Sequence, residues 1–214
     1  MGRDLMQRHF LFTIGHSTRP IDDFIRLLKS HGVQRVVDVR TLPRSRFNPH
    51  FDISRLPALL RAADIHYTHL PGLGGLRRPH RDSRNSGWRN KSFRGYADYM
   101  QSAAFDSSLQ QCLELASVER VALMCAEAVP WRCHRSLIAD ALVARGIDAL
   151  EIASEARVRP HKLTSFAHVE GTAVTYPAPS NETANESQPM RREHCSANSR
   201  GDADAPIERV DDFT

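Results

Sequence analysis

The chain has 214 residues, 41% hydrophobic and 25% charged, a composition typical of one globular domain with a sizeable core. It has no run of eighteen apolar residues and no apolar leader at its start, so we expect neither a membrane-spanning helix nor export. Four cysteines are too few for a disulfide framework in a chain of this length, and we expect reduced thiols in the cytoplasm.

The net charge of +4 is distributed unevenly along the chain. Residues 171–214 carry eight acidic and four basic side chains, so the rest of the chain has a net charge of +8. All but three of the basic residues are arginines, whose planar guanidinium binds phosphate and carboxylate groups through paired hydrogen bonds. This surplus fits an anionic partner, and it fits equally a genome that favours arginine codons.

Apolar runs and helical patterns alternate from residue 10 onward. Five apolar or β-branched runs predict strands, at residues 10–15, 33–39, 65–70, 121–125 and 147–152. Apolar residues at helical spacing predict helices at 21–32, 56–64, 93–118 (with a break near Phe105) and 136–145. Strands that alternate with helices form βαβ units, so we expect an α/β fold: a single-domain three-layer sandwich around a mostly parallel sheet.

The chain is expected to have three parts. Residues 1–9 form an N-terminal extension, and residues 10–170 form the α/β domain. Pro, Ser, Asn, Glu and Ala dominate residues 171–214, which cannot bury enough apolar surface to offset the entropy of ordering. We therefore expect this acidic tail to be disordered.

Polar groups follow the first two strands directly. The first strand ends in His16 and Ser17, and the second ends in Asp38 and Arg40, with Arg44 beyond them. Ligands of open α/β sheets bind beyond the carboxyl ends of the strands, so these side chains are candidates for one shared site. The alternative for Asp38 and Arg40 is that they pair with each other and hold the edge of the sheet.

The loop after the fourth strand carries the most chemistry. Cys133 and Arg135 stand at the start of a helix, where the helix dipole and nearby arginines lower the pKa of a thiol and favour anions. Glu127 follows an apolar strand, where an unpaired carboxylate is costly, which suggests an acid or base role. The alternative is that Cys125 and Cys133 are small residues of the core.

Two known cysteine chemistries fit this loop poorly. Cysteine phosphatases and rhodaneses place an arginine six positions after the cysteine, whereas Trp131 is six positions after Cys125 and Arg132 is one position too far. Cysteine and histidine are also zinc ligands, but the spacing from Cys125 to Cys133 is longer than is usual for zinc hairpins. We therefore predict no metal ligand, and the sequence identifies no cofactor.

An arginine-rich segment follows a glycine-containing loop at residues 72–75. The loop does not lead into a helix, so neither nucleotide-binding fingerprint applies. Residues 77–94 contain seven basic side chains and one acid, with Trp88 and Phe93 interleaved and Tyr96 just beyond. Charge combined with aromatic rings suits phosphate contact and base stacking, and the alternative is a solvated, mobile loop.

Five short motifs in this order resemble the domain-of-unknown-function family 488. They are Thr13-Ile14-Gly15-His16-Ser17, Val37-Asp38-Val39-Arg40 with Pro43-Arg44-Ser45, Leu70-Pro71-Gly72-Leu73-Gly74-Gly75, Tyr96-Ala97-Asp98-Tyr99-Met100, and Cys125-Ala126-Glu127 with Cys133-His134-Arg135. The resemblance covers roughly residues 10–155, and it implies a shared fold and site but no particular reaction. The resemblance implies that the characteristic positions of the family are these: His16, Asp38, Arg40, Glu127, Cys133, His134 and Arg135.

The first functional hypothesis is an enzyme that acts on a phosphorylated, nucleotide or nucleic-acid substrate at an anion site. Its predicted catalytic residues are Glu127, Cys133 and His16. Its predicted substrate-binding residues are Ser17, Asp38, Arg40, Arg44, His134 and Arg135. The alternatives are a non-catalytic nucleic-acid or nucleotide binding module on the same basic surface, and a structural interaction domain that uses the tail. The expected partner is a phosphate-bearing small molecule or a nucleic acid, without a membrane.

Overall fold

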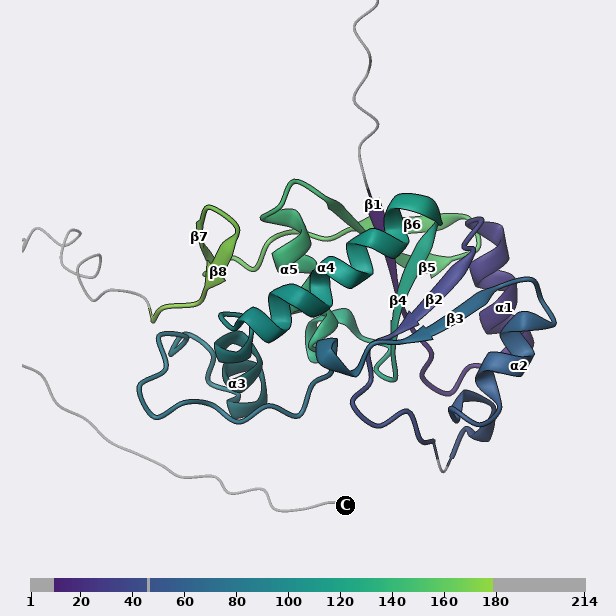
Figure 1. Cartoon of the computed structure of the whole chain (residues 1–214), viewed down its shortest axis with the longest axis horizontal. Helices are drawn as coiled ribbons and strands as arrows, with labels where there is room; N and C mark the ends of the chain where they lie inside the picture. Colours follow the sequence, from purple (N-terminus) through teal and green to yellow (C-terminus); the bar gives the residue numbers. More distant parts are fainter. Residues whose placement is uncertain (1–9, 46, 179–214) are drawn as a thin grey trace, which may run out of the picture. The chain divides into compact units, whose positions relative to one another are not determined.

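The computed structural model describes residues 10–45 and 47–178. The expected N-terminal extension and residues 179–214 of the expected tail lie outside the described residues. Within the described part, strands and helices alternate along the chain as the sequence predicts (Figure 1). None of the helices in this part has the length and apolar composition needed to cross a bilayer.

A six-stranded sheet forms the centre of the domain. Its strands are β1 (Phe10–Gly15), β2 (Arg35–Asp38), β3 (His66–His69), β4 (Val121–Cys125), β5 (Asp148–Ser154) and β6 (Arg157–Pro160). They lie in the order β3-β2-β4-β1-β5-β6, of which the first five are parallel and β6 is antiparallel. Parallel neighbours need crossover connections, and helices supply all four of them. The predicted α/β class and mostly parallel sheet are confirmed.

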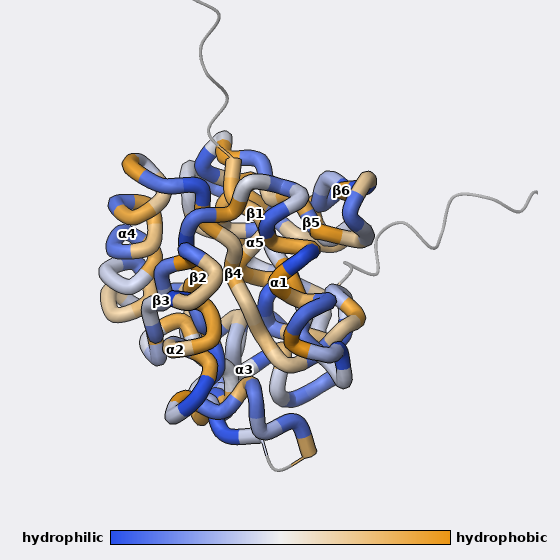
Figure 2. Tube along the Cα trace, turned by 90° about the vertical axis from the view of Figure 1, so that its right-hand side faces the viewer, coloured by the Kyte–Doolittle hydropathy of each residue, from blue (hydrophilic) through white to orange (hydrophobic). Residues whose placement is uncertain are grey.

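Helices cover both faces of the sheet. They are α1 (Ile21–Ser30), α2 (Leu56–Arg61), α3 (Lys91–Tyr99), α4 (Ala103–Val118) and α5 (Arg135–Val143), with short 3₁₀ turns η1 (Pro49–Phe51), η2 (Pro71–Leu73) and η3 (Pro130–Arg132). Buried residues of α3, α4 and α5 pack on one face, and those of α1 and α2 pack on the other. The predicted three-layer sandwich is confirmed, and Figure 2 shows hydrophobic and hydrophilic residues alternating along α1.

Strand β4 shows why the sequence produces two cores. All five of its residues are buried, and successive side chains of a strand point to opposite faces. Leu123 and Cys125 belong to the core beneath α4 and α5, which we call the first core. Ala122 and Met124 belong to the second core, beneath α1 and α2. An apolar run therefore occurs where both faces of the sheet are covered.

The folded part of the chain extends beyond the predicted boundary at residue 171. Strands β7 (His168–Glu170) and β8 (Ala173–Thr175) form a hairpin, whose turn contains Gly171 at a φ of +60°. Tyr176 is fully buried in the first core, and its hydroxyl donates a hydrogen bond to Asp140 at 2.7 Å. The prediction that the tail begins at 171 is wrong, because one aromatic ring anchors this otherwise polar stretch.

Two further details differ from the sequence prediction. The helical segment breaks at Ser102, not at Phe105, because the Ser102 hydroxyl caps α4 by accepting a hydrogen bond from the Phe105 amide. Strand β6 was not predicted, since it has only four residues and ends in Pro160, which only the edge of a sheet tolerates. It places Arg159 beside β5.

Candidate functional site

The carboxyl ends of β1 and β4 meet at the same edge of the sheet. Gly15 pairs with Cys125, and the amide of His16 donates to the carbonyl oxygen of Cys125 at 3.0 Å. Gly15 has to be glycine, because a Cβ at this position would overlap the carbonyl group of Glu127. The fold thus brings the loops after the two strands into contact, as the sequence predicts for a parallel sheet.

Asp38 and Arg40 form a buried ion pair at this edge. The Arg40 Nε donates to both carboxylate oxygens of Asp38, at 2.9 and 3.1 Å, and Nη2 donates to Asp38 and to the carbonyl oxygen of Phe51. The Tyr67 hydroxyl donates to Asp38 at 2.9 Å, and Arg40 Nη1 lies 3.3 Å from His16 Nε2. Every guanidinium nitrogen of Arg40 therefore has a protein partner. Asp38 and Arg40 pair with each other at the edge of the sheet, which is the alternative that the sequence left open.

His16 is 3% exposed and is held in one tautomer. Because arginine has only donors, the Nε2 of His16 accepts from Arg40 and its Nδ1 donates to the carbonyl oxygen of Ser17 at 2.8 Å. The ring stacks on Phe51 with centroids 4.1 Å apart. Burial lowers the pKa of His16 to about 4, so the imidazole is neutral at pH 7. Both ring nitrogens are occupied, and the catalytic role of His16 stays a prediction.

Cys125, Cys133 and His134 form a second cluster on the side of the first core. The His134 Nδ1 lies 4.0 Å from the Cys125 sulfur and 3.8 Å from the Cys133 sulfur. The His134 Nε2 lies 3.1 Å from the carbonyl oxygen of Val39, so this nitrogen carries the hydrogen and Nδ1 presents its lone pair to the sulfurs. The Gly75 backbone packs against the ring of His134, where a Cβ would lie 3.1 Å from Nδ1.

The two sulfurs of this cluster differ in their affinity for a proton. The hydrogen bond from the Cys125 thiol, together with the positive charge of Arg135, lowers the pKa of Cys133. The same hydrogen bond, and burial, raise the pKa of Cys125. The backbone amide of Arg135 also donates to the Cys133 sulfur at 3.5 Å. Cys133 therefore loses its proton more readily than Cys125, as its predicted place at a helix start suggests.

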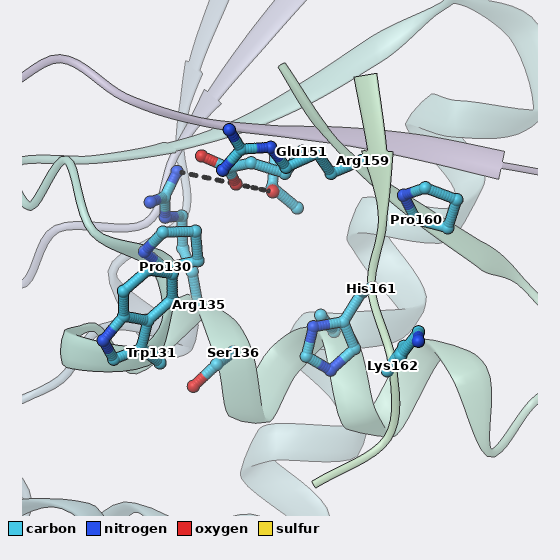
Figure 3. A pocket seen from close by; sticks show the side chains of 11 residues that line it. Pro130, Trp131, Arg135, Ser136, Glu151, Arg159, Pro160, His161 and Lys162 are labelled. Atoms are coloured by element: carbon cyan, nitrogen blue, oxygen red, sulfur yellow. Dashed lines mark hydrogen bonds and ion pairs between the residues drawn. The ribbon is translucent and has the colours of Figure 1, made fainter. Parts of the chain in front are cut away.

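Arg135 lies on the wall of a cavity of about 250 Å³ (Figure 3). The residue is 1% exposed, its Nη2 donates to the carbonyl oxygen of Glu127 at 3.0 Å, and its Nη1 lies 3.8 Å from a carboxylate oxygen of Glu151. Neither Nε nor Nη1 has a hydrogen-bond partner. Side chains from five segments line the rest of the cavity, among them Thr13, Trp131, Glu151, Arg159, His161 and Lys162.

Glu151 and Thr13 are site residues that the sequence reasoning missed. They pair in register on β5 and β1, and the Thr13 hydroxyl donates to Glu151 Oε2 at 2.5 Å. Burial raises the pKa of Glu151, although the charge of Arg135 opposes this change. A signal was present in the sequence, since a carboxylate within the apolar run at 147–152 is costly unless it has partners.

Asp140 fixes the wall of the cavity opposite Arg135. It is fully buried in α5 and accepts hydrogen bonds from His161 Nε2 at 2.7 Å, from the amide and hydroxyl of Thr164, and from Tyr176. These bonds tie the segment after β6 to α5, and this segment carries Lys162. Asp140 therefore anchors this part of the cavity wall to α5.

Three predicted site residues belong neither to the cavity lining nor to the two clusters. Glu127 is exposed, and its carboxylate accepts a hydrogen bond from the amide of Val129 at 3.0 Å, so the argument that this carboxylate is buried is wrong. Arg44 is exposed on the loop after β2. Ser17 has a φ of +48°, and its amide donates to the carbonyl oxygen of Ala126 at 2.9 Å. Their functional roles stay predictions.

Most of the predicted residues form two clusters at this edge of the sheet. The ring of His16 stacks on Phe51 of the second core, and Arg40 binds the carbonyl group of the same Phe51. Cys125 and Cys133 belong to the first core. These groups reach the edge from opposite faces of the sheet, because alternate residues of a strand point to opposite faces. The charge of Arg135 still acts on His16, and the expectation of a single site stays a prediction.

The aromatic residues of the arginine-rich segment point inward. Tyr96 is 1% exposed, and the ring of Trp88 packs against Phe93, Phe166 and Tyr176 with centroids 4.7, 4.9 and 5.5 Å apart. Since these rings belong to the first core or pack against it, the expectation that they stack on bases is wrong.

A family model described as domain of unknown function DUF488 matches residues 20–142, which is more than half of the chain. The chain belongs to this family. The DUF488 match includes the ion pair of Asp38 with Arg40, the cysteine cluster and Arg135, whereas His16 and Glu151 lie outside it. The predicted resemblance is thereby confirmed. Among curated proteins no match is found, and among solved structures there is none either.

Proposed function

We propose that the chain is an enzyme that acts on a small phosphate-bearing substrate, whose anionic group binds Arg135 in the cavity between α5 and β5. The observation that carries this proposal is a guanidinium at 1% exposure whose Nε and Nη1 lack a hydrogen-bond partner, with only the Glu151 carboxylate 3.8 Å from Nη1. A buried charge with unsatisfied donors is costly, and such groups need an explanation in a folded protein. An anion that accepts from Nε and Nη1 removes the cost.

The surroundings of Arg135 support a nucleotide-sized ligand. Arg159 and Lys162 line the same cavity and add positive charge, whereas Glu151 is the one acid among the lining residues. A cavity of about 250 Å³ accommodates a phosphate and an attached sugar but not a duplex. Trp131 lines the cavity with 69% of its surface exposed, and an indole in this position suits stacking on a base.

The acid–base role is best assigned to Glu151. A buried carboxyl group with a raised pKa holds its proton closer to neutral pH and is suited to general acid catalysis. Glu151 lies beside the proposed anion site, 3.8 Å from Arg135 Nη1. Of the predicted catalytic residues, none lines the cavity, so the proposal moves this role to β5.

Calorimetry with three probes tests the binding part of the proposal: inorganic phosphate, a nucleoside 5′-monophosphate and the corresponding nucleoside. We expect the monophosphate to bind most tightly and the nucleoside most weakly. Arg159→Ala removes one charge from the cavity and is expected to raise the Kd about tenfold, equivalent to about 1.4 kcal/mol. The matched control is Arg157→Ala, since Arg157 is exposed on the same strand and does not line the cavity. Absence of saturable binding, or equal effects of the two variants, would overturn the proposal.

Turnover tests the catalytic part. Phosphorylated metabolites, nucleotides and short oligonucleotides with terminal phosphates are incubated with the protein, and products are detected by mass spectrometry. We expect Glu151→Gln to abolish turnover and to retain phosphate binding. Glu155→Gln is the control, because Glu155 is an exposed partner of Arg26 outside the cavity. Binding without any turnover would favour the non-catalytic binding module. The proposal includes a cytoplasmic location, which free thiols at Cys112, Cys125 and Cys133 support.

A further inference from the structure

The cysteine cluster has the composition and spacing of a metal centre. The ligand atoms of Cys125, Cys133 and His134 all lie within 4.8 Å of one another, and the two nitrogen–sulfur distances are 4.0 and 3.8 Å. In a tetrahedral zinc site with Zn–S of about 2.3 Å and Zn–N of about 2.0 Å, sulfur and nitrogen ligands lie about 3.5 Å apart. The two nitrogen–sulfur distances of 4.0 and 3.8 Å exceed this value by only a few tenths of an ångström.

The orientation of His134 also suits a metal ligand. Its Nε2 donates to the carbonyl oxygen of Val39 at 3.1 Å, and this bond directs the Nδ1 lone pair toward both sulfurs. Histidines that bind metals typically donate their other nitrogen to a carbonyl or carboxylate group, which fixes the ring and its tautomer. The amide of Arg135 donates to the Cys133 sulfur, as expected beside a thiolate ligand.

Cys112, a third cysteine of the first core, differs from the two cysteines of the cluster in its surroundings. Cys112 of α4 is fully buried among apolar residues, and no nitrogen or second sulfur lies near it among the described contacts. It has the environment of a small core residue. Cys125 and Cys133 are buried to a similar extent, yet each faces a sulfur and an imidazole nitrogen. Burial alone therefore does not account for the cluster.

We propose that Cys125, Cys133 and His134 bind one thiophilic divalent metal ion of the zinc class. Two thiolates balance the charge of the ion, and thiolate and imidazole donors select zinc over magnesium or calcium. Within the described residues, no fourth histidine, cysteine or acidic side chain joins the group. The fourth position is thus left to water or an external ligand. This inference rests on contacts other than those of the cavity, and each proposal stands without the other.

The spacing of the two cysteines does not fit a zinc hairpin, and the fold brings them together in another way. Seven residues lie between the two cysteines, which is longer than the usual spacing in a zinc hairpin. The 3₁₀ turn η3 (Pro130–Arg132) folds the chain back, so that the start of α5 returns to the end of β4. The three ligands therefore converge through tertiary structure.

Metal content tests the inference on the full chain, with any affinity tag removed. The protein is purified under reducing conditions without chelator, incubated with zinc, desalted and analysed by mass spectrometry of the metal. We expect about one zinc per chain, and cobalt substitution should give a thiolate charge-transfer band with tetrahedral visible bands. Cys133→Ser and His134→Asn should lower the bound metal at least tenfold, whereas Cys112→Ser should keep one per chain.

Three results would overturn the inference. One is wild-type protein that holds less than a tenth of an equivalent of zinc. Another is full metal binding by the double variant Cys125→Ser/Cys133→Ser. The third is a disulfide between Cys125 and Cys133, shown by peptide mapping of protein kept under reducing conditions. The wild-type cobalt spectrum keeps the test decisive even where a variant does not fold.

Discussion

Replacing Arg135 by methionine tests whether this arginine binds a ligand or only stabilises the folded protein. The guanidinium loses one hydrogen bond, from Nη2 to the carbonyl oxygen of Glu127, which costs about 1.5–3 kcal/mol for a charged donor. The change also removes two buried nitrogens without hydrogen-bond partners, each of which destabilises the folded state by about 1–3 kcal/mol, and it removes the ion-pair contact with Glu151. Methionine fills much of the same volume, so no large cavity is added. These effects offset each other. We therefore expect the free energy of unfolding of the ligand-free variant to lie within about 2 kcal/mol of the wild-type value.

Urea unfolding followed by far-UV circular dichroism measures this difference, with and without saturating phosphate. Phosphate at a hundred times its Kd should stabilise the wild type by about 2.7 kcal/mol and the Arg135→Met variant not at all. A loss of about 3–5 kcal/mol in the absence of phosphate is the value for breaking a compensated buried ion pair. That result would show that Glu151 and the backbone satisfy the guanidinium, and it would refute the reasoning.

Three further predictions concern the same edge of the sheet. Tyr67→Phe removes the hydrogen bond to buried Asp38 and should lower the free energy of unfolding, measured with denaturant, by about 1.5–3 kcal/mol. Tyr99→Phe removes a hydrogen bond to a neutral carbonyl group and should lower it by only about 0.5–1.5 kcal/mol. Equal losses would contradict the argument that a charged acceptor makes the stronger bond. The folded pKa of His16 is about 4 against an ordinary 6.5, so the unfolded chain takes up the proton first, and stability present above pH 6.5 is lost as the pH falls toward 4. This loss is on the order of 3 kcal/mol, and the His16→Asn variant should not show it. If the free energy of unfolding falls with pH in the same way in the variant and the wild type, the imidazole is not buried in its neutral form. The pKa of Glu151 is raised above its ordinary 4.5, so its contribution to stability is present below pH 4.5 and is lost as the pH rises through the folded value. Glu151→Gln should abolish that decline in urea titrations above pH 4.5, and an unchanged decline would argue against a protonated carboxyl group.

The start of α5 connects the two proposals physically. Cys133 and His134 supply ligands of the proposed metal, and the next residue, Arg135, extends into the cavity. The amide of Arg135 donates to the Cys133 sulfur while its side chain donates to the carbonyl group of Glu127. A metal at the cluster would therefore fix the helix start and, with it, the guanidinium. The first turn of α5 would then position both the metal ligands and the guanidinium of Arg135.

Much of the fold follows from local pattern. The run at Phe10–Gly15, the helical spacing of α1 and the five buried residues of β4 predict their elements directly, because a sheet covered on both faces needs apolar strands. The polar groups at the strand ends, His16 and Asp38 among them, also follow from the rule that parallel strands present their carboxyl ends at one edge. Sequence pattern thus identified the sheet, its order of elements and the residues at its functional edge.

Only the tertiary structure decided which of those residues meet. Whether Asp38 binds a ligand or Arg40 depends on where the guanidinium points, and no spacing encodes that. Glu151 was missed because its partner, Thr13, lies 138 residues away on a neighbouring strand. The division into an ion-pair cluster and a cysteine cluster arises because alternate residues enter opposite cores. Sequence determined which chemical groups reach the edge, and packing of distant segments determined which of them retain unsatisfied donors or ligand atoms.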